Sequence, residues 1–221
     1  MTEYLKDGRP RLPPNQVVTR KFPVMTAGTP VTAGKDSWSL TLDGEVARPL
    51  TLDWQGLTAL AQQEFTVDIH CVTRWSKLDT RWRGVSVQTL VNLVGPAPEA
   101  AYVQARADGN YTANLRLVDL LGDKAFVATD YDGKPLAEDH GGPARLVVPG
   151  LYFWKSAKWL RGLHFSQFDY KGYWEKLGYT ITAIPGRSSG TGDDIARARN
   201  HRPDPCLPPV RGGFRPDRDA T

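Results

Sequence analysis

Alternation of apolar and polar residues predicts the first strands of the chain. In residues 37–46, SWSLTLDGEV, large apolar side chains occupy every second position, which is the period of a half-buried strand. The pair Asp43-Gly44 in this segment is typical of a hairpin turn. Residues 65–71, FTVDIHC, predict another strand. Cys71 is therefore expected where a strand gives way to a loop.

Capping residues and helical spacing predict two short helices. Asp53 is a suitable N-cap for residues 54–60, in which leucines recur at helical spacing. Ser86 is a suitable N-cap for a second helix over residues 87–94, whose apolar residues also recur at helical spacing, and Gly95 ends that helix.

The second half of the chain mixes strand and helix patterns. Residues 125–129 and 144–150 predict strands around a hairpin turn at Asp132-Gly133, and residues 115–122 predict a short helix before them. Residues 158–174 are rich in aromatic side chains and predict a strand that runs into a structured loop. The pattern as a whole predicts an α+β fold with mixed β sheets and short helices.

Length and composition fit a single folded domain with two flanking segments. The chain has 221 residues, of which 40% are hydrophobic and seven are tryptophan, enough for one core. The predicted division is a polar N-terminal arm at residues 1–19, a main domain at 20–185, and a Pro/Gly/Arg-rich tail at 186–221.

Charge and hydropathy narrow the expected partners and compartment. The net charge of +4 owes much to arginines in the tail, and no aromatic-basic motif for nucleic acid is visible. We therefore expect no nucleic-acid partner. The N-terminus has no apolar signal region and no segment reaches the length of a membrane span. A cytoplasmic protein with no membrane insertion is the expectation.

Cys71 is the first candidate for chemistry. The only other cysteine, Cys206, lies in the tail, which argues against a disulfide framework. The neighbouring His70 should point to the opposite face of the strand, and no CxxC pair or HExxH motif supports zinc. A buried apolar thiol, a nucleophile served by a distant histidine, and a soft-metal ligand all stay open.

A second constellation lies in HGGPARLVVPG at 140–150 and WKSAKW at 154–159. Its glycines permit close approach of a ligand to the backbone, and its basic and hydroxyl side chains could surround a phosphate. The candidate donors are His140, Arg145, Lys155, Ser156 and Lys158. The alternative is a simple turn before a buried strand, with solvated lysines.

Five strings in this order resemble the molybdopterin domain of sulfite oxidases and their bacterial relatives. The resemblance extends over residues 20–179. The strings are R-K-F-P-V at 20–24, C-V-T-R-W-S at 71–76, H-G-G-P-A-R-L-V-V-P at 140–149, K-S-A-K-W at 155–159 and D-Y-K-G at 169–172.

The resemblance implies a fold like the sulfite oxidase molybdopterin domain over residues 20–185 and a molybdenum-pterin cofactor. Cys71 becomes the thiolate ligand of molybdenum, since soft sulfur donors suit this metal. Tyr170, Arg20 and Arg74 become candidates for catalysis or substrate binding beside Cys71. The cofactor-binding residues implied are Phe22, Cys71, Asp108, His140, Arg145, Ser156, Ala157 and Lys158.

The implied function is oxygen-atom transfer on a small substrate, either a sulfite-like anion or an S- or N-oxide. Electrons would be exchanged with a separate partner, because no haem or flavin motif is visible. Phe22 stands where sulfite oxidases have a histidine, so sulfite specificity is not implied. The alternative is a non-catalytic protein that binds or stores molybdopterin.

Overall fold

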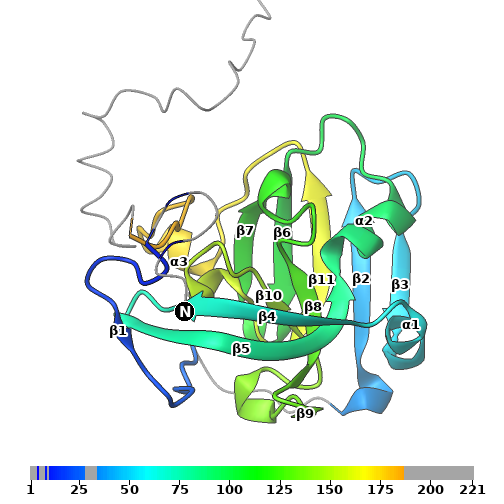
Figure 1. Ribbon diagram of the computed structural model, residues 1–221. Coiled ribbons are helices and arrows are strands. Elements are labelled where there is room, and N and C mark those ends of the chain that lie inside the picture. The colour runs from blue at the N-terminus through cyan, green and yellow to red at the C-terminus, as the bar shows by residue number, and fades with distance from the viewer. Residues whose placement is uncertain (1–3, 5–7, 9, 28–33, 187–221) are drawn as a thin grey trace, which may run out of the picture.

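The structure is a computed structural model that describes residues 4, 8, 10–27 and 34–186. Its strands form two sheets (Figure 1). One has the order β1-β5-β8-β10, with β4 also paired to β5 and β9 to β8; the other has the order β3-β2-β11-β6-β7. The strands are β1 (Val17–Val18), β2 (Ser39–Gly44), β3 (Leu50–Asp53), β4 (Gln63–His70), β5 (Trp75–Ser86), β6 (Tyr102–Ala107), β7 (Thr112–Arg116), β8 (Phe126–Tyr131), β9 (Lys134–Pro135), β10 (Arg145–Val147) and β11 (Leu160–Ser166).

Both sheets are mixed, as the sequence predicts. The pairs β1·β5 and β11·β2 are parallel, and the other pairs are antiparallel. Helices are short. They are α1 (Trp54–Ala59), α2 (Val87–Val94) and α3 (Tyr173–Lys176), with 3-10 turns η1 (Lys35–Ser37), η2 (Asp108–Asn110), η3 (Leu117–Asp119), η4 (Glu138–His140) and η5 (Phe153–Lys155). The α+β prediction is therefore confirmed.

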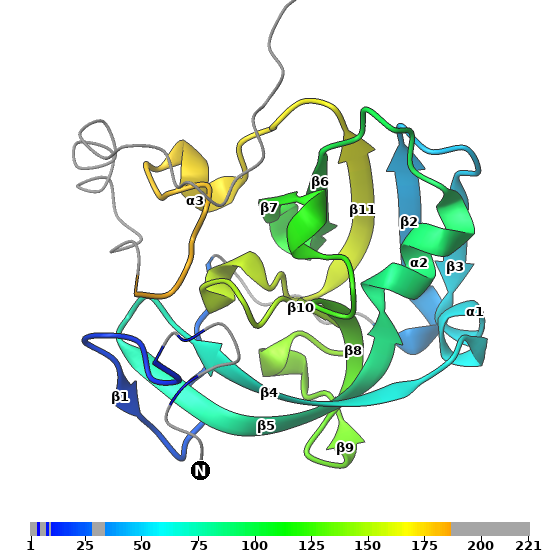
Figure 2. The ribbon, with the colours of Figure 1, turned by 45° about the horizontal axis from the view of Figure 1, so that its top comes forward.

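One hydrophobic core joins the two sheets with α1 and α2. It takes side chains from β2, such as Leu40 and Leu42, and from α2, such as Leu90, all fully buried. In Figures 1 and 2 the long hairpin of β4 and β5 runs across the five-stranded sheet, with α1 and α2 beside β2 and β3. The end of this hairpin nearest β1 carries Cys71.

The predicted helix starts are confirmed by their caps. The Asp53 side chain accepts a hydrogen bond from the Gly56 amide at 2.7 Å, and the Ser86 side chain accepts one from the Gln88 amide at 3.1 Å. Gly95 ends α2 in the left-handed conformation. Strand β4 ends at His70, directly before Cys71.

The helix predicted at 115–122 is wrong over most of its length. Leu115 and Arg116 end β7, where Leu115 pairs with Val103 of β6 and is buried in the core. Only Leu117–Asp119 form a single 3-10 turn. Tertiary pairing has overridden local helical preference here.

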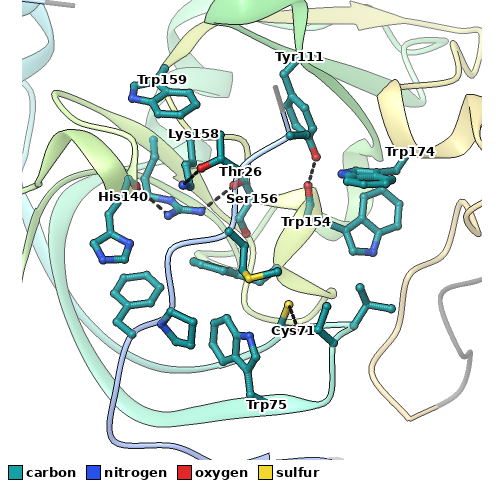
Figure 3. A pocket seen from close by; sticks show the side chains of 18 of the residues that line it. Thr26, Cys71, Trp75, Tyr111, His140, Trp154, Ser156, Lys158, Trp159 and Trp174 are labelled. Carbon is teal, nitrogen blue, oxygen red and sulfur yellow. Dashed lines mark hydrogen bonds between the residues drawn. The ribbon is translucent and has the colours of Figure 1, made fainter. Parts of the chain in front are cut away.

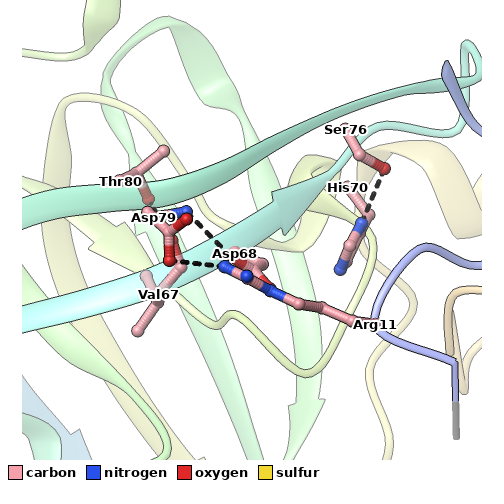
Figure 4. Close-up of polar contacts among 7 residues, drawn as sticks. All are labelled: Arg11, Val67, Asp68, His70, Ser76, Asp79 and Thr80. Atoms are coloured by element: carbon pink, nitrogen blue, oxygen red, sulfur yellow. Dashed lines mark hydrogen bonds and ion pairs between the residues drawn. The ribbon is translucent and has the colours of Figure 1, made fainter. Parts of the chain in front are cut away.

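The predicted N-terminal arm is attached to the β4–β5 hairpin. Its strand β1 pairs with β5, and the Arg11 guanidinium donates to both carboxylate oxygens of Asp68 at 2.7 and 2.8 Å (Figure 4). Gln16 in this arm is buried. Within the described ranges, no helix is long and apolar enough to cross a membrane. The predicted tail lies outside the described residues from 187 onward.

Candidate active site

Cys71 begins the turn between β4 and β5, and its neighbours divide between two faces. His70 pairs with Ser76, and their side chains share a hydrogen bond of 2.8 Å. Cys71 and Trp75 are one step closer to the turn, with the Cys71 amide donating to the Trp75 carbonyl at 2.8 Å. Because side chains alternate along a strand, these two share the opposite face. His70 is thus directed away from the thiol, as the sequence predicts.

The thiol faces a cavity of about 230 Å³ (Figure 3). Its walls come from segments distant in the sequence, and most lining side chains are aromatic or apolar. The lining residues are Phe22, Pro23, Met25, Thr26, Ala27, Cys71, Val72, Thr73, Trp75, Tyr111, His140, Arg145, Phe153, Trp154, Ser156, Lys158, Trp159, Trp174 and Tyr179.

Three basic residues, His140, Arg145 and Lys158, line one end of this cavity; we call them the cationic cluster. Arg145 is 1% exposed and donates to the carbonyls of His140 and Ser156, each at 2.8 Å, and of Leu146 at 3.4 Å. A guanidinium has five N–H donors. Two of these N–H groups therefore have no hydrogen bond to a described residue and could bind a ligand.

Burial and mutual repulsion control the charges of this cluster. Desolvation lowers the pKa of Arg145 to about 9. Desolvation, followed by repulsion from the Arg145 charge, lowers the pKa of Lys158 to about 8. Desolvation, followed by repulsion from Arg145 and Lys158, lowers the pKa of His140 to about 4. No ion pair between described residues involves any of the three. Near neutral pH, His140 is therefore uncharged, and Arg145 and Lys158 supply the positive charge, which the nearby Asp139 only partly offsets. Two such charges favour an anion.

The glycine turn of the H-G-G-P string packs closely against Lys158 of the cationic cluster. Gly141 has φ +100°, and a Cβ there would lie 2.8 Å from the Cα of Lys158. Only glycine permits this contact. The turn thereby brings His140 beside Lys158, which supports the phosphate interpretation without making the glycines themselves ligands.

Phe22 and Thr26 extend the cluster from the N-terminal side. The Phe22 ring stacks on the His140 ring, with centroids 3.9 Å apart and planes 11° apart. The Lys158 ammonium donates to the Thr26 hydroxyl at 3.0 Å. These contacts join a segment near the start of the domain to residues of its second half.

The structure thus brings together six of the predicted site residues around one cavity: Phe22, Cys71, His140, Arg145, Ser156 and Lys158. The others lie elsewhere. Asp108 forms an ion pair with Arg161 at 2.8 Å. Arg20 and Arg74 are exposed, and Tyr170 is 49% exposed with its ring near His164. Ala157 is buried, and its carbonyl accepts from the Leu146 amide.

Lys155, the fifth candidate phosphate donor, does not reach the cavity. Its ammonium is fully buried, donates to the carbonyl and side-chain oxygens of Asn114 at 2.6 Å, and forms an ion pair with Glu175. Both the expected phosphate contact and the alternative of a solvated lysine are wrong for this residue, because a buried carboxylate supplies its partner.

The D-Y-K-G string has a structural explanation. The Asp169 carboxylate accepts from the Asn114 side chain, and a Cβ on Gly172 would lie 2.6 Å from both the Thr112 carbonyl and Glu175. These residues fix α3 against β7. They account for the string without a role for Tyr170 at the cavity.

Sequence reasoning missed the aromatic lining. Tyr111, Trp154, Trp174 and Tyr179 line the cavity, and Trp75 lies across the turn from Cys71. One available signal was Trp75 itself, which lies in the same C-V-T-R-W-S string as Cys71. Another was the pair of tryptophans that flanks the basic string at 154–159.

Comparison with known families decides what this arrangement is. The family model described as "Oxidoreductase molybdopterin binding domain" matches residues 26–174, well over half of the chain. The chain belongs to this family. It is therefore a molybdenum-dependent oxidoreductase, and its cofactor is molybdopterin with molybdenum. This settles the alternative of a non-catalytic storage protein in favour of an enzyme.

Three relatives with different degrees of sequence identity agree with this family. The "Uncharacterized oxidoreductase YuiH" of Bacillus subtilis is 42% identical over 176 residues, 79% of this chain and 89% of its own. The catalytic subunit MsrP of a protein-methionine-sulfoxide reductase from Campylobacter jejuni is 26% identical; the match covers 63% of this chain and about half of MsrP, 52%. The sulfane dehydrogenase SoxCD of Paracoccus pantotrophus has the same fold, with a TM-score of 0.58 at 21% identity over 63% of this chain and 41% of its own.

The chemistry of the donor set fits a molybdopterin oxidoreductase. A phosphate-bearing group matches the cationic cluster, where the buried Nδ1 of His140 has no hydrogen-bond partner among the described residues. A soft metal matches the Cys71 thiol. Three or more His, Cys, Asp or Glu that could hold a metal by themselves are not found together in the described ranges. Cys71 would thus share the metal with the cofactor's own sulfurs.

Proposed function

We propose that this oxidoreductase reduces a small neutral sulfoxide to a thioether. The proposal rests on one observation: the Cys71 thiol shares a cavity with the cationic cluster at one end and aromatic side chains over most of the rest. In balanced form, the sulfoxide takes up two electrons and two protons and yields the thioether and water. When bound, the cofactor supplies the two-electron couple for this exchange.

The residues of the chain would divide the work of binding. Arg145, Lys158 and Ser156 hold the phosphate of the cofactor, with His140 and the ring of Phe22 beside it. Cys71 is the protein's ligand to molybdenum, and a metal-bound thiol is held deprotonated. The aromatic lining excludes water, which strengthens these electrostatic interactions.

The charge distribution favours a neutral substrate over sulfite. The basic residues that line the cavity all belong to the cationic cluster, which the cofactor phosphate would occupy. Arg20 and Arg74, the residues implied for anion binding, are exposed and outside the lining. A second anion would therefore meet little compensating charge. The relative MsrP is the catalytic subunit of a protein-methionine-sulfoxide reductase, which agrees with a sulfoxide substrate.

A comparison of substrates tests the proposal. The purified enzyme, with molybdenum and pterin content measured, is supplied with dimethyl sulfoxide and reduced viologen, and separately with sulfite and ferricyanide. We expect sulfoxide reduction to exceed sulfite oxidation in kcat/KM. Loaded enzyme that oxidises sulfite and reduces no sulfoxide would refute the proposal.

Cys71→Ser supplies the matched control for that assay. We expect it to retain pterin, because the cationic cluster is intact, and to lose turnover. The electron donor in the cell is proposed to be a separate redox partner, for which reduced viologen stands in.

A further inference from the structure

Three side chains form a continuous aromatic wall of the cavity: Trp154, Trp174 and Tyr179. The Tyr179 ring centroid lies 5.5 Å from that of Trp154 and 4.8 Å from that of Trp174, with interplanar angles of 78° and 47°. Each ring is partly exposed. The wall therefore adds aromatic ring surface to the cavity, and the buried indole N–H of Trp154 has no hydrogen-bond partner among the described residues.

The aromatic wall and the cationic cluster lie on opposite sides of the cavity. In Figure 3, Lys158 and His140 are on one side and Trp154 and Trp174 on the other, with Cys71 below both groups. As proposed above, the cationic cluster would hold the phosphate of the cofactor and Cys71 would hold the metal. The aromatic wall would then border the remaining part of the cavity, where a substrate could be held.

The chemistry of this wall selects the part of a substrate that it can hold. Aromatic rings make favourable contacts with polarizable sulfur and with alkyl groups. None of the residues in the aromatic wall carries a charge that would bind an anion. We propose that the wall is a substrate subsite that holds the sulfur and methyl groups of a methylated sulfoxide, which would leave the sulfoxide oxygen free to reach the metal that Cys71 would hold. This inference rests on the proposed function and names residues for it.

A buried ion pair positions the wall. Lys155 follows Trp154 on η5, and Glu175 follows Trp174 on α3; their side chains pair at 0% and 1% exposure. The Lys155 ammonium also lies 4.6 Å from the centroid of the Trp154 ring. Because each charged residue is next to a wall tryptophan, the pair fixes the spacing of the two indoles. Lys155 and Glu175 are thus positioning residues.

Leucine substitutions in the wall test the inference. Trp174→Leu and Tyr179→Leu remove an aromatic surface each, and Phe168→Leu is the matched control, since Phe168 is 58% exposed and outside the lining. With dimethyl sulfoxide and reduced viologen, we expect each wall variant to raise KM about tenfold while kcat stays within about twofold, because binding common to ground and transition states is lost. The control should match the wild type.

A product inhibitor and the cofactor content complete the test. Dimethyl sulfide lacks the oxygen, so its competitive inhibition constant should rise by the same factor as KM in both wall variants. Unchanged KM and inhibition constants in either folded variant, with active wild type, would overturn the subsite alone. Loss of pterin from the wall variants would also overturn it, because the wall would then serve the cofactor. A loaded wild type that reduces no sulfoxide would overturn the proposed function and the subsite together.

Discussion

Gln16, in the N-terminal arm, donates a hydrogen bond from its side-chain amide to the backbone carbonyl of Cys71 at 3.1 Å. The Ser76 hydroxyl donates to the Gln16 side-chain oxygen, also at 3.1 Å. A buried glutamine thus links the turn that carries the thiol to the strand that follows it.

Gln16→Ala should loosen this turn. Losing the buried bond is expected to cost about 1 kcal/mol in the free energy of unfolding and to reduce the molybdenum content of the purified enzyme. Gln62→Ala is the control, because Gln62 also donates to backbone carbonyls, at 3.1 Å, but at the end of α1 and outside the cavity lining. If both variants lose the same amount of metal, Gln16 has no special relation to Cys71.

Lys158→Met removes one charge of the cationic cluster and keeps most of the side-chain volume. We expect weaker retention of the cofactor, by about 1.5–3 kcal/mol for a hydrogen bond to a charged group. Pterin released per protein after dialysis is the measurement. Lys171→Met, at an exposed lysine outside the lining, should retain the cofactor fully. Equal retention in both variants would contradict the phosphate site.

His140 should make the cofactor-free protein less stable in acid. Burial and the charges of Arg145 and Lys158 lower its pKa from 6.5 to about 4. Between these values the unfolded chain binds more protons than the folded one, so stability falls as the pH decreases through this window. Melting temperatures at pH 7 and pH 5 measure the effect.

The difference in melting temperature between the two pH values should shrink in His140→Gln. It should persist in His164→Gln, because His140 is intact there. A full pH response in His140→Gln would show that other groups cause it.

Tyr170→Phe tests whether Tyr170 acts at the metal, as the resemblance implies, or has no part in turnover, as its position suggests. The resemblance implies that Tyr170 acts near the metal, yet the residue is 49% exposed and outside the cavity lining. From its position we expect turnover within about twofold of the wild type. A large fall in kcat with full cofactor content would restore the implied role.

Local signals in the sequence were sufficient for several elements. The caps at Asp53 and Ser86 place the starts of α1 and α2, and the strand pattern of 65–71 places the end of β4 within one residue of its observed end at His70. The twelve residues of β5 escaped prediction, since their polar side chains give no clear strand pattern. Its place in the sheet is set by pairing with β4 and β8. The arm, the tail and the cytoplasmic location stay predictions.

The site was predictable as far as the resemblance reached and no further. Cys71 and the cationic cluster lie in strings that resemble the family, and they share the cavity. Lys155 lies in the same kind of string, but its burial depends on Glu175, twenty residues on, which no local pattern reveals. The aromatic wall depends likewise on how α3 packs.

The cavity is enclosed by both ends of the described domain, from Phe22 to Tyr179. A ligand bound in this cavity would contact both the segment at Phe22 and the segment at Tyr179. Because these lining segments come together only in the folded chain, we expect the ligand to bind after folding. Resistance of those two segments to proteolysis should then rise on loading, because a ligand that binds only the folded state stabilises it.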